Sequence, residues 1–333
     1  MIRRALADGY RRVLSAPALL CGVFVLTFLL ALPLAIAMRD MLTAHLGRSM
    51  TAASVADGVN YDWWQEFLAH TSGLGATFTP SVIGFAAVLD NVSSVMDAQP
   101  EAAPVAGALA AYILGWLFLS GGIIDRYARQ RRAGAAPFFS ACGVHFFRFL
   151  RLAALAAVAY WILFVHVHRW LFGAWANINR DLAVERTAIL WRFGFYVVFA
   201  VLLAAVNLLF DYAKIRTVVE DRRSMIGAFG AAAGFIRRHP GRTLGLYTAN
   251  ALLFLVVIAA WSFVAPGAGR GGWSMWIGFA AGQAYLLVRL ALKLQFMASQ
   301  TSLFQRSLAH ADYVAAPVPM WPDSPAVEAI GAP

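Results

Sequence analysis

Charged residues are scarce in this chain, and their scarcity excludes an ordinary soluble domain. Asp, Glu, Lys and Arg make up 13% of the 333 residues, and hydrophobic residues make up 61%. Soluble domains hold about 25% charged and 45–50% apolar residues. One water-soluble core of this size cannot bury so much apolar surface, so the bilayer must solvate much of it. The sequence therefore predicts an all-α, polytopic membrane protein.

Acidic residues are the scarcer of the two charge signs, with 17 Asp and Glu against 27 Lys and Arg. The basic excess does not predict nucleic-acid binding, because arginines retained on the cytoplasmic side of a membrane protein explain it. The partners expected are membrane lipids, together with a membrane-protein partner or a second copy of the chain.

Cysteine is almost absent, which excludes a disulfide framework. Cys21 and Cys142 are the two cysteines, and both fall on the predicted inner half, where thiols stay reduced.

The common catalytic motifs are also missing. The chain holds no G-x-S-x-G, no phosphate-binding glycine loop and no H-E-x-x-H. Ser120 has no histidine placed beside it. His166 and His168 are two residues apart, which is about 200° on a helix, so they cannot share an ion. The sequence predicts no catalytic residue, no cofactor and no metal site.

Long apolar runs dominate what is present. Each is long enough to cross about 30 Å of hydrocarbon. The six predicted spans are about 17–38, 104–124, 149–171, 189–210, 243–264 and 273–297. We expect them to form a single transmembrane domain over 1–308, with amphipathic interfacial helices such as basic residues 1–15. A short loop is predicted over 173–188, and a disordered cytoplasmic tail over 309–333.

The longest polar region, 39–103, is predicted to be an outer loop. It holds seven acidic and two basic residues. Residues 57–69 carry Trp63 and Trp64 and suit a helix at the membrane interface. Residues 79–96 predict a second, mildly apolar helix that is too polar to span.

The arginines and lysines set the predicted orientation. Of the 27, 20 fall on inner segments and 7 on outer segments when both termini are placed inside. An even number of spans also puts both termini on one side. The sequence therefore predicts a bacterial inner-membrane protein with cytoplasmic termini.

Three basic segments each feed an outward span, which suggests a quasi-repeat of three two-helix units around an axis. The first two returning spans end near Asp125 and Asp211, each with a cation within one turn, Arg129 and Lys214. The third copy has Gln295 instead. The alternative is that unrelated hydrophobic helices ending in arginine look alike.

The stretch from Asp211 to Arg242, DYAKIRTVVEDRRSMIGAFGAAAGFIRRHPGR, joins two of the spans. Its basic amphipathic helix, small-residue run and arginine pair resemble a set of bacterial multi-pass inner-membrane proteins. That set includes the membrane domain of some glycerophosphodiester phosphodiesterases. The resemblance covers mainly residues 110–300 and implies a six-helix membrane domain. It implies no catalytic site, because the soluble phosphodiesterase domain is absent from this chain.

The same stretch supplies candidate lipid-binding residues. Val219, Ile226, Phe229, Ala233 and Ile236 are expected to share one apolar helix face. The candidate cations around this face are Arg222, Arg223, Arg237 and Arg238. A membrane-surface helix that grips anionic lipid is one interpretation. An ordinary positive-inside loop is the other, and it is preferred.

Small residues recur at Gly230-x-x-x-Gly234 and Gly278-x-x-x-Gly282. This spacing lets helix backbones approach closely in lipid. Packing within the bundle is preferred over dimerisation.

Arg289 and Lys293 lie four residues apart in the sixth span, deeper than cations that reach the interface. They are expected to pair with Asp125 and Asp211 inside the bundle. The alternative is that they bind an anionic substrate or a lipid headgroup.

These residues lead to one preferred function and two alternatives. The preferred function is a non-enzymatic membrane protein that binds lipid or protein partners through its basic cytoplasmic face and outer helical loop. The first alternative is a transporter of a small anionic or lipid-like substrate, with Arg289 and Lys293 on its path. The second is a lipid-processing enzyme, which needs convergent acids near a headgroup plane.

Overall fold

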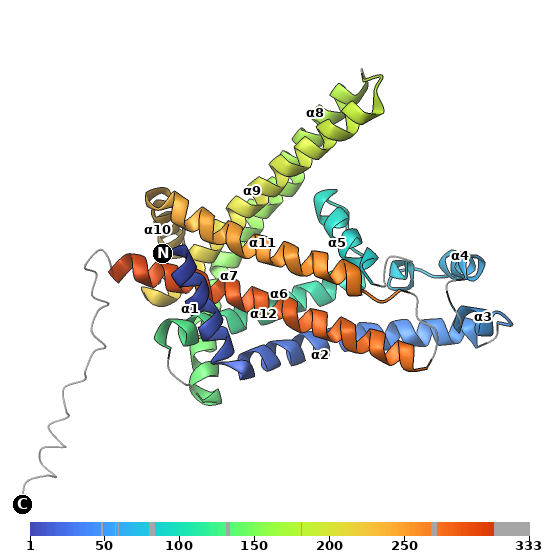
Figure 1. Cartoon of the computed structure of the whole chain (residues 1–333), viewed down its shortest axis with the longest axis horizontal. Helices are drawn as coiled ribbons and strands as arrows, with labels where there is room; N and C mark the ends of the chain where they lie inside the picture. Colours follow the sequence, from blue (N-terminus) through green and yellow to red (C-terminus); the bar gives the residue numbers. More distant parts are fainter. Residues whose placement is uncertain are drawn as a thin grey trace, which may run out of the picture.

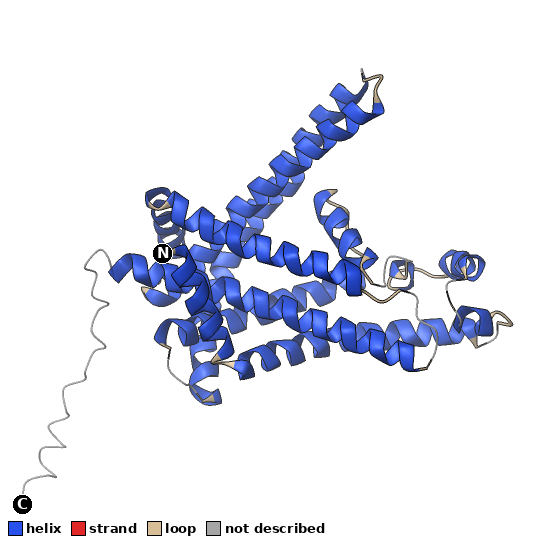
Figure 2. Ribbon diagram, in the orientation of Figure 1, coloured by secondary structure: helices blue, strands red, loops and turns tan. Residues whose placement is uncertain are grey.

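The computed structural model describes residues 1–47, 49–56, 58, 60–79, 84–130, 134–180, 182–267 and 272–309. This part of the chain is built from helices and contains no strand (Figure 2). Of the predicted tail 309–333, all but Ala309 lies outside the described residues, as do residues 268–271 between the fifth and sixth predicted spans.

The helices follow one another with short connections. In chain order they are α1 (Ile2–Leu14), α2 (Pro17–Leu46), α3 (Ala52–Ala56), α4 (Tyr61–His70), η1 (Gly75–Thr77), α5 (Ala86–Met96), α6 (Ala103–Arg129), α7 (Ala135–Trp161), η3 (Ile162–Val167), α8 (His168–Arg180), α9 (Glu185–Val219), α10 (Met225–Arg238), α11 (Pro240–Val264) and α12 (Trp273–Ala309).

Six helices of the described chain are long and apolar enough to cross a membrane. They cover Pro17–Leu46, Ala103–Arg129, Ala135–Arg180, Glu185–Val219, Pro240–Val264 and Trp273–Leu308. The prediction of an all-α protein with six spanning helices is confirmed, and the chain is a multi-pass membrane protein.

Several helices continue beyond the predicted spans. The connection predicted over 173–188 is shorter than expected, because α7, the π-helical turn η3 and α8 form one helix that ends at Arg180, and α9 begins at Glu185. Leu171 and Phe172 of α8 pack with Phe199 of α9, which extends the hairpin. Hydropathy marks where a chain crosses hydrocarbon, whereas helix propagation adds a backbone hydrogen bond for each further residue.

The spanning helices form two groups that meet at one end of the molecule (Figure 1). In the first group α12 contacts α2, α6 and α11; in the second, the α7–η3–α8 helix and α9 form a hairpin. Each predicted two-helix unit is a contacting pair: α2 with α6, α7 with α9, and α11 with α12. The middle pair diverges from the other two, so the units are not evenly spaced around one axis.

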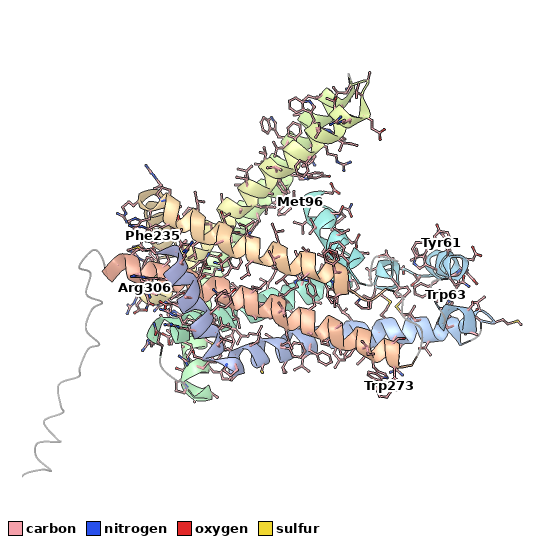
Figure 3. All side chains as sticks on the ribbon, viewed as in Figure 1. Tyr61, Trp63, Met96, Phe235, Trp273 and Arg306 are labelled. Carbon is pink, nitrogen blue, oxygen red and sulfur yellow. The ribbon has the colours of Figure 1, made fainter. Side chains whose placement is uncertain are left out.

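We call the end where the groups meet the basic end. It contains α1, α10 and the C-terminal part of α12, whereas α3 and α4 lie at the far end of the first group and the tip of α8 at the far end of the second (Figure 1). Phe235 and Arg306 mark the basic end in Figure 3. The largest fully buried side chains gather there, among them Tyr127, Tyr212 and Phe304.

The C-terminal part of α12 is buried although it is polar. Gln295, Ser299 and Gln300 are at most 2% exposed, because α1 covers this part of α12. Gln295 Nε2 donates to the carbonyl of Leu6 at 3.0 Å. A Cβ on Gly9 would lie 2.8–2.9 Å from side-chain atoms of Gln295 and Ser299. Helix α1 is therefore part of the packed core as well as a basic amphipathic helix.

The predicted outer loop forms short helices at the far end. Within predicted helix 57–69, α4 buries Trp63 and Phe67 beside His45 of α2; Asp57 and Val59 lie outside the described residues. Within predicted helix 79–96, α5 begins at Ala86, and residues 80–83 are not described.

The C-terminal end of α5 is attached to the α7–α9 hairpin. Nε2 of His168 lies 2.9 Å from the carbonyl oxygen of Met96, and the Tyr196 hydroxyl donates to Asp97. Arg192 also reaches the Asp97 carboxylate, at 3.5 Å. The outer segment is thereby connected to the hairpin, and Figure 3 labels Met96 at this contact.

Candidate functional site

Lys293 of α12 holds its ammonium group against α6. Its Nζ lies 3.6 Å from the ring centroid of Trp116 and 5.1 Å from that of Tyr112. Trp116 is the middle residue of the 27-residue helix α6. At 1.5 Å per residue, it lies about 20 Å from either end of that helix. A lysine ammonium group therefore sits near the middle of a membrane-spanning helix.

Arg289 lies one helical turn from Lys293 and faces another pair of rings. Its Cζ lies 5.8 Å from the centroid of Phe254 and 5.6 Å from that of Tyr285. Both Arg289 and Lys293 remain exposed at the surface of the helix bundle. The two cations are thus supported by aromatic faces on one side and left open on the other.

An ion pair on α9 lies within electrostatic range of Lys293. Lys214 Nζ is 2.8 Å from Asp211 Oδ1, and Gln300 of α12 approaches the other carboxylate oxygen at 3.4 Å. Asp211 is the acid that acts on Lys293, while Lys214 and Arg289 add positive charge. The surroundings of Lys293 therefore carry a net positive charge.

The pairing expected for Arg289 and Lys293 is not the one found in the described chain. Asp125 pairs with Arg129 at 2.7 Å and Asp211 with Lys214, so each acid takes a cation from its own helix. These intrahelical contacts agree with the predicted spacing of three and four residues. Aromatic rings, and not carboxylates, then support the two cations of α12.

The connector from Asp211 to Arg242 is not one helix, because it holds the end of α9, all of α10 and the start of α11. After Val219 the chain turns through Asp221, whose φ of 47° is left-handed. The Arg222 amide donates to the Thr217 carbonyl and the Asp221 amide to that of Val218. This pair of bonds is a Schellman motif, which ends helices. Ser224 then caps α10 by accepting from the amide of Gly227 at 3.2 Å.

The predicted apolar face of this connector is right only in part, because the turn rotates α10 relative to α9. Val219, Phe229 and Ile236 pack against the buried core. Ile226 is 75% exposed, and the buried face of α10 is Met225, Ala228, Ala232 and Phe235. Arg222 does not lie across an apolar face, since it pairs with Glu220 in the turn.

Arginines at this turn are bound by acids. Arg216 donates from Nη2 to Glu220 at 2.6 Å and from Nη1 to the Ala231 carbonyl of α10. Burial raises the pKa of Glu220, but hydrogen bonds from Arg216 and Arg222 outweigh burial and lower its pKa overall. A hydrogen bond from Arg148 lowers the pKa of Asp221.

Arg223, Arg237 and Arg238 have a different environment. All three are exposed at the basic end, and the described residues provide them with no ion pair. They remain candidate contacts for anionic lipid.

The glycine pairs do not mark close approaches within the bundle. A Cβ on Gly230 or Gly282 would meet no atom within 4 Å, and one on Gly234 only an arginine tip at 3.9 Å. Gly278 is the exception, with Pro266 at 3.3 Å. The preferred interpretation, packing within the bundle, is therefore wrong for the 230–234 pair.

Ser120 and the histidines of the third span form no reactive group in the described chain. Ser120 donates to the Trp116 carbonyl at 2.5 Å. His168 contacts Met96 as described above. No group of three or more His, Cys, Asp or Glu in the described residues has metal-site geometry.

Several residues of these sites escaped the sequence-based predictions. Hydropathy shows Trp116 and Tyr112 only as part of a span, although their four-residue spacing puts them on one face of α6. The polar residues between Gln295 and Ser302 also indicate that this part of α12 contacts protein and not lipid on several faces. No signal in the sequence identifies which helix faces Lys293.

No family model, curated protein or solved structure matches this chain. The site is therefore interpreted from its own geometry.

Proposed function

We propose that this multi-pass protein is a non-enzymatic lipid-binding protein that holds the acidic group of an anionic amphiphile beside Lys293. The observation that carries the proposal is an exposed lysine near the middle of a membrane-spanning helix. Its ammonium group lies against the rings of Trp116 and Tyr112 and forms no ion pair with a carboxylate of the described residues. An anionic group supplied by a lipid-like molecule completes this environment.

The magnitudes favour a bound anion. A lysine at the centre of a spanning helix costs about 3 kcal/mol to insert, and cation–π contacts return about 0.5–2 kcal/mol. The Asp211 carboxylate is already neutralised by Lys214. Part of the cost is therefore left for a ligand to offset.

The arginines of the basic end support the same function. Arg223, Arg237 and Arg238 are exposed, and each such cation near an anionic surface contributes about 1 kcal/mol. The positive-inside bias makes this the cytoplasmic face of a bacterial inner membrane in our proposal, with both termini inside.

Transport of a small anionic or lipid-like substrate is the second candidate. The depth of Lys293 favours it, because a cation at mid-depth can meet a ligand from either side. A lipid-processing enzyme is a weaker fit, since Asp8, Asp125, Glu220 and Asp221 at the basic end are bound to arginines.

Lys293→Gln tests the proposal. The protein is placed in nanodiscs that contain phosphatidylglycerol and phosphatidylcholine with the same chains, and retained lipid is counted by native mass spectrometry. We expect the variant to lose about tenfold in retention of phosphatidylglycerol, as a contact worth about 1.4 kcal/mol implies. Arg186→Gln, an exposed site at the far end of α9, is the control of equal charge.

Equal retention by the wild type and both variants contradicts lipid binding at Lys293. Transport is tested separately by following a fluorescent phosphatidylglycerol between leaflets of sealed vesicles. Binding without movement supports the first candidate, and Lys293-dependent movement supports the second.

A further inference from the structure

An apolar cavity of about 890 Å³ lies between α2, α6 and the start of α7. Leu26, Leu29, Phe118 and Phe139 are among its lining residues, and Arg126 is the one charged side chain in the lining that the structure describes. Ligand sites have volumes of about 300–1,000 Å³. The cavity is thus large enough for a ligand, and it is polar at one point.

The length of the cavity corresponds to one leaflet. It extends along α2 from Pro17 at the basic end to Leu29, which is about 18 Å at the helical rise. Half of a hydrocarbon core of about 30 Å is about 15 Å. A groove of this length matches acyl chains that enter from the leaflet at the basic end.

Arg126 also lines two further cavities, of which the first is mainly polar. It lines a cavity of about 450 Å³ with Asp8, Arg11, Arg12 and Arg306. It also lines a cavity of about 460 Å³ with Asp125, Arg129 and His145. One guanidinium therefore stands where an apolar groove meets polar space.

The other cations around these cavities are largely bound. Arg306 pairs with Asp8, and Arg129 pairs with Asp125. Hydrogen bonds from Arg306 and Ser302 outweigh the effect of burial and lower the pKa of Asp8 overall, so this carboxylate stays ionised. Arg12 donates to the Tyr127 carbonyl at 2.7 Å.

Arg126 and Arg11 differ from these cations. Among the described residues neither side chain has a hydrogen bond or an ion pair. Two guanidinium groups thus remain available to a ligand at the polar end of the groove.

We propose that this groove is a binding site for an anionic phospholipid, with acyl chains along α2 and α6 and the phosphate on Arg126 and Arg11. Charge complementarity selects this occupant. An uncharged lipid leaves both guanidinium groups unpaired, and an apolar face of a second protein copy supplies no anion. Guanidinium groups bind phosphate oxygens in a bidentate geometry.

This site is separate from Lys293 and does not depend on the proposed function. The lining of the groove includes neither Lys293 nor Trp116 and Tyr112, the two rings that hold its ammonium group.

The test uses the full chain in nanodiscs with equal amounts of phosphatidylglycerol and phosphatidylcholine that carry the same chains. Arg126→Gln removes the charge, and Gly22→Trp fills the groove, since a Cβ on Gly22 meets no atom within 4 Å. Arg4→Gln, an exposed residue of α1, controls for charge. Gly107→Trp controls for bulk, because its Cβ also meets nothing within 4 Å and lies outside the groove.

We expect Arg126→Gln to weaken retention of phosphatidylglycerol about fivefold, the factor for a contact of about 1 kcal/mol. Gly22→Trp is expected to weaken it at least as much. Arg126→Lys keeps the charge and retains part of the binding, which separates loss of the site from misfolding. Native mass spectrometry counts the lipids bound to each protein. Arg126→Gln and Lys293→Gln are each expected to lose one of two retained phosphatidylglycerol molecules, and the double variant both, so failure of the two proposals is distinguishable.

Four results overturn the inference. Two are unchanged retention of phosphatidylglycerol in Arg126→Gln and in Gly22→Trp. The third is equal binding of phosphatidylglycerol and phosphatidylcholine by the wild type. The fourth is a fall in oligomer mass in Gly22→Trp without loss of lipid. The last result assigns the groove to a second copy of the chain.

Discussion

The ion pair between Arg216 and Glu220, four residues apart at the end of α9, is expected to position the guanidinium that binds α10. The two side chains are 9% and 10% exposed, and Arg216 also donates to the Ala231 carbonyl of α10. Glu220→Gln keeps the shape and removes the negative charge. The variant therefore leaves a nearly buried guanidinium without its counter-ion.

The expected loss is about 3 kcal/mol of unfolding free energy. Removing one partner of a buried ion pair costs about 3–5 kcal/mol. The lower value applies here, because the introduced amide still accepts one hydrogen bond. Arg216 also keeps its bond to Ala231 and its contact with the Phe304 ring at 5.4 Å. For a chain of this length, such a loss lowers the melting temperature by about 5–10 °C.

Thermal unfolding in a mild detergent, followed by intrinsic tryptophan fluorescence, measures the effect. Arg129→Gln is the matched control, since it breaks an ion pair whose arginine side chain is 70% exposed. Exposed pairs contribute about 0–1 kcal/mol. If Glu220→Gln unfolds at the same temperature as Arg129→Gln, this reasoning is refuted.

The pH dependence provides a second check. The pKa of Glu220 is lowered in the folded protein, so its contribution is present above the ordinary glutamate pKa and is lost as pH falls through the lowered value. The difference in melting temperature between wild type and Glu220→Gln is therefore expected to be full near neutral pH and to shrink below about pH 4.

Two further predictions concern packing of the outer segment and of α1. Asp97→Asn weakens the contact of α5 with Arg192 and Tyr196. The backbone amides of residues 86–97 should then exchange with deuterium faster than in the wild type, while those of α12 exchange at the same rate. Equal exchange rates at residues 86–97 in variant and wild type contradict the attachment. Gly9→Val forces atoms to within 2.8–2.9 Å of α12 side chains and should cost about 1–3 kcal/mol of stability. Gly230→Val, where a Cβ meets nothing, is its control in thermal unfolding, and equal losses in both variants would show that the close approach of α1 to α12 is not responsible.

The helix pairs and their local contacts were accessible from the sequence because they depend on neighbouring residues. Asp125 with Arg129, and Asp211 with Lys214, follow from three- and four-residue spacing on one helix. The end of α9 was not accessible, because its Schellman turn has Asp221 where glycine is usual. Without that turn, Ile226 is assigned to the same face as Val219, whereas the structure exposes it.

The amino-acid sequence alone determined that the chain is all-helical and crosses the membrane six times, since hydrocarbon imposes long apolar runs whatever the fold. It also placed two deep cations in the sixth span. Only the tertiary structure decided what these cations contact: Lys293 faces a ring of α6, and Arg289 faces a ring of α11. It also formed the groove that ends at Arg126. The reason is physical. Hydropathy measures transfer from water to lipid and is blind to which helices touch, whereas helix contacts depend on packing among side chains far apart in the chain.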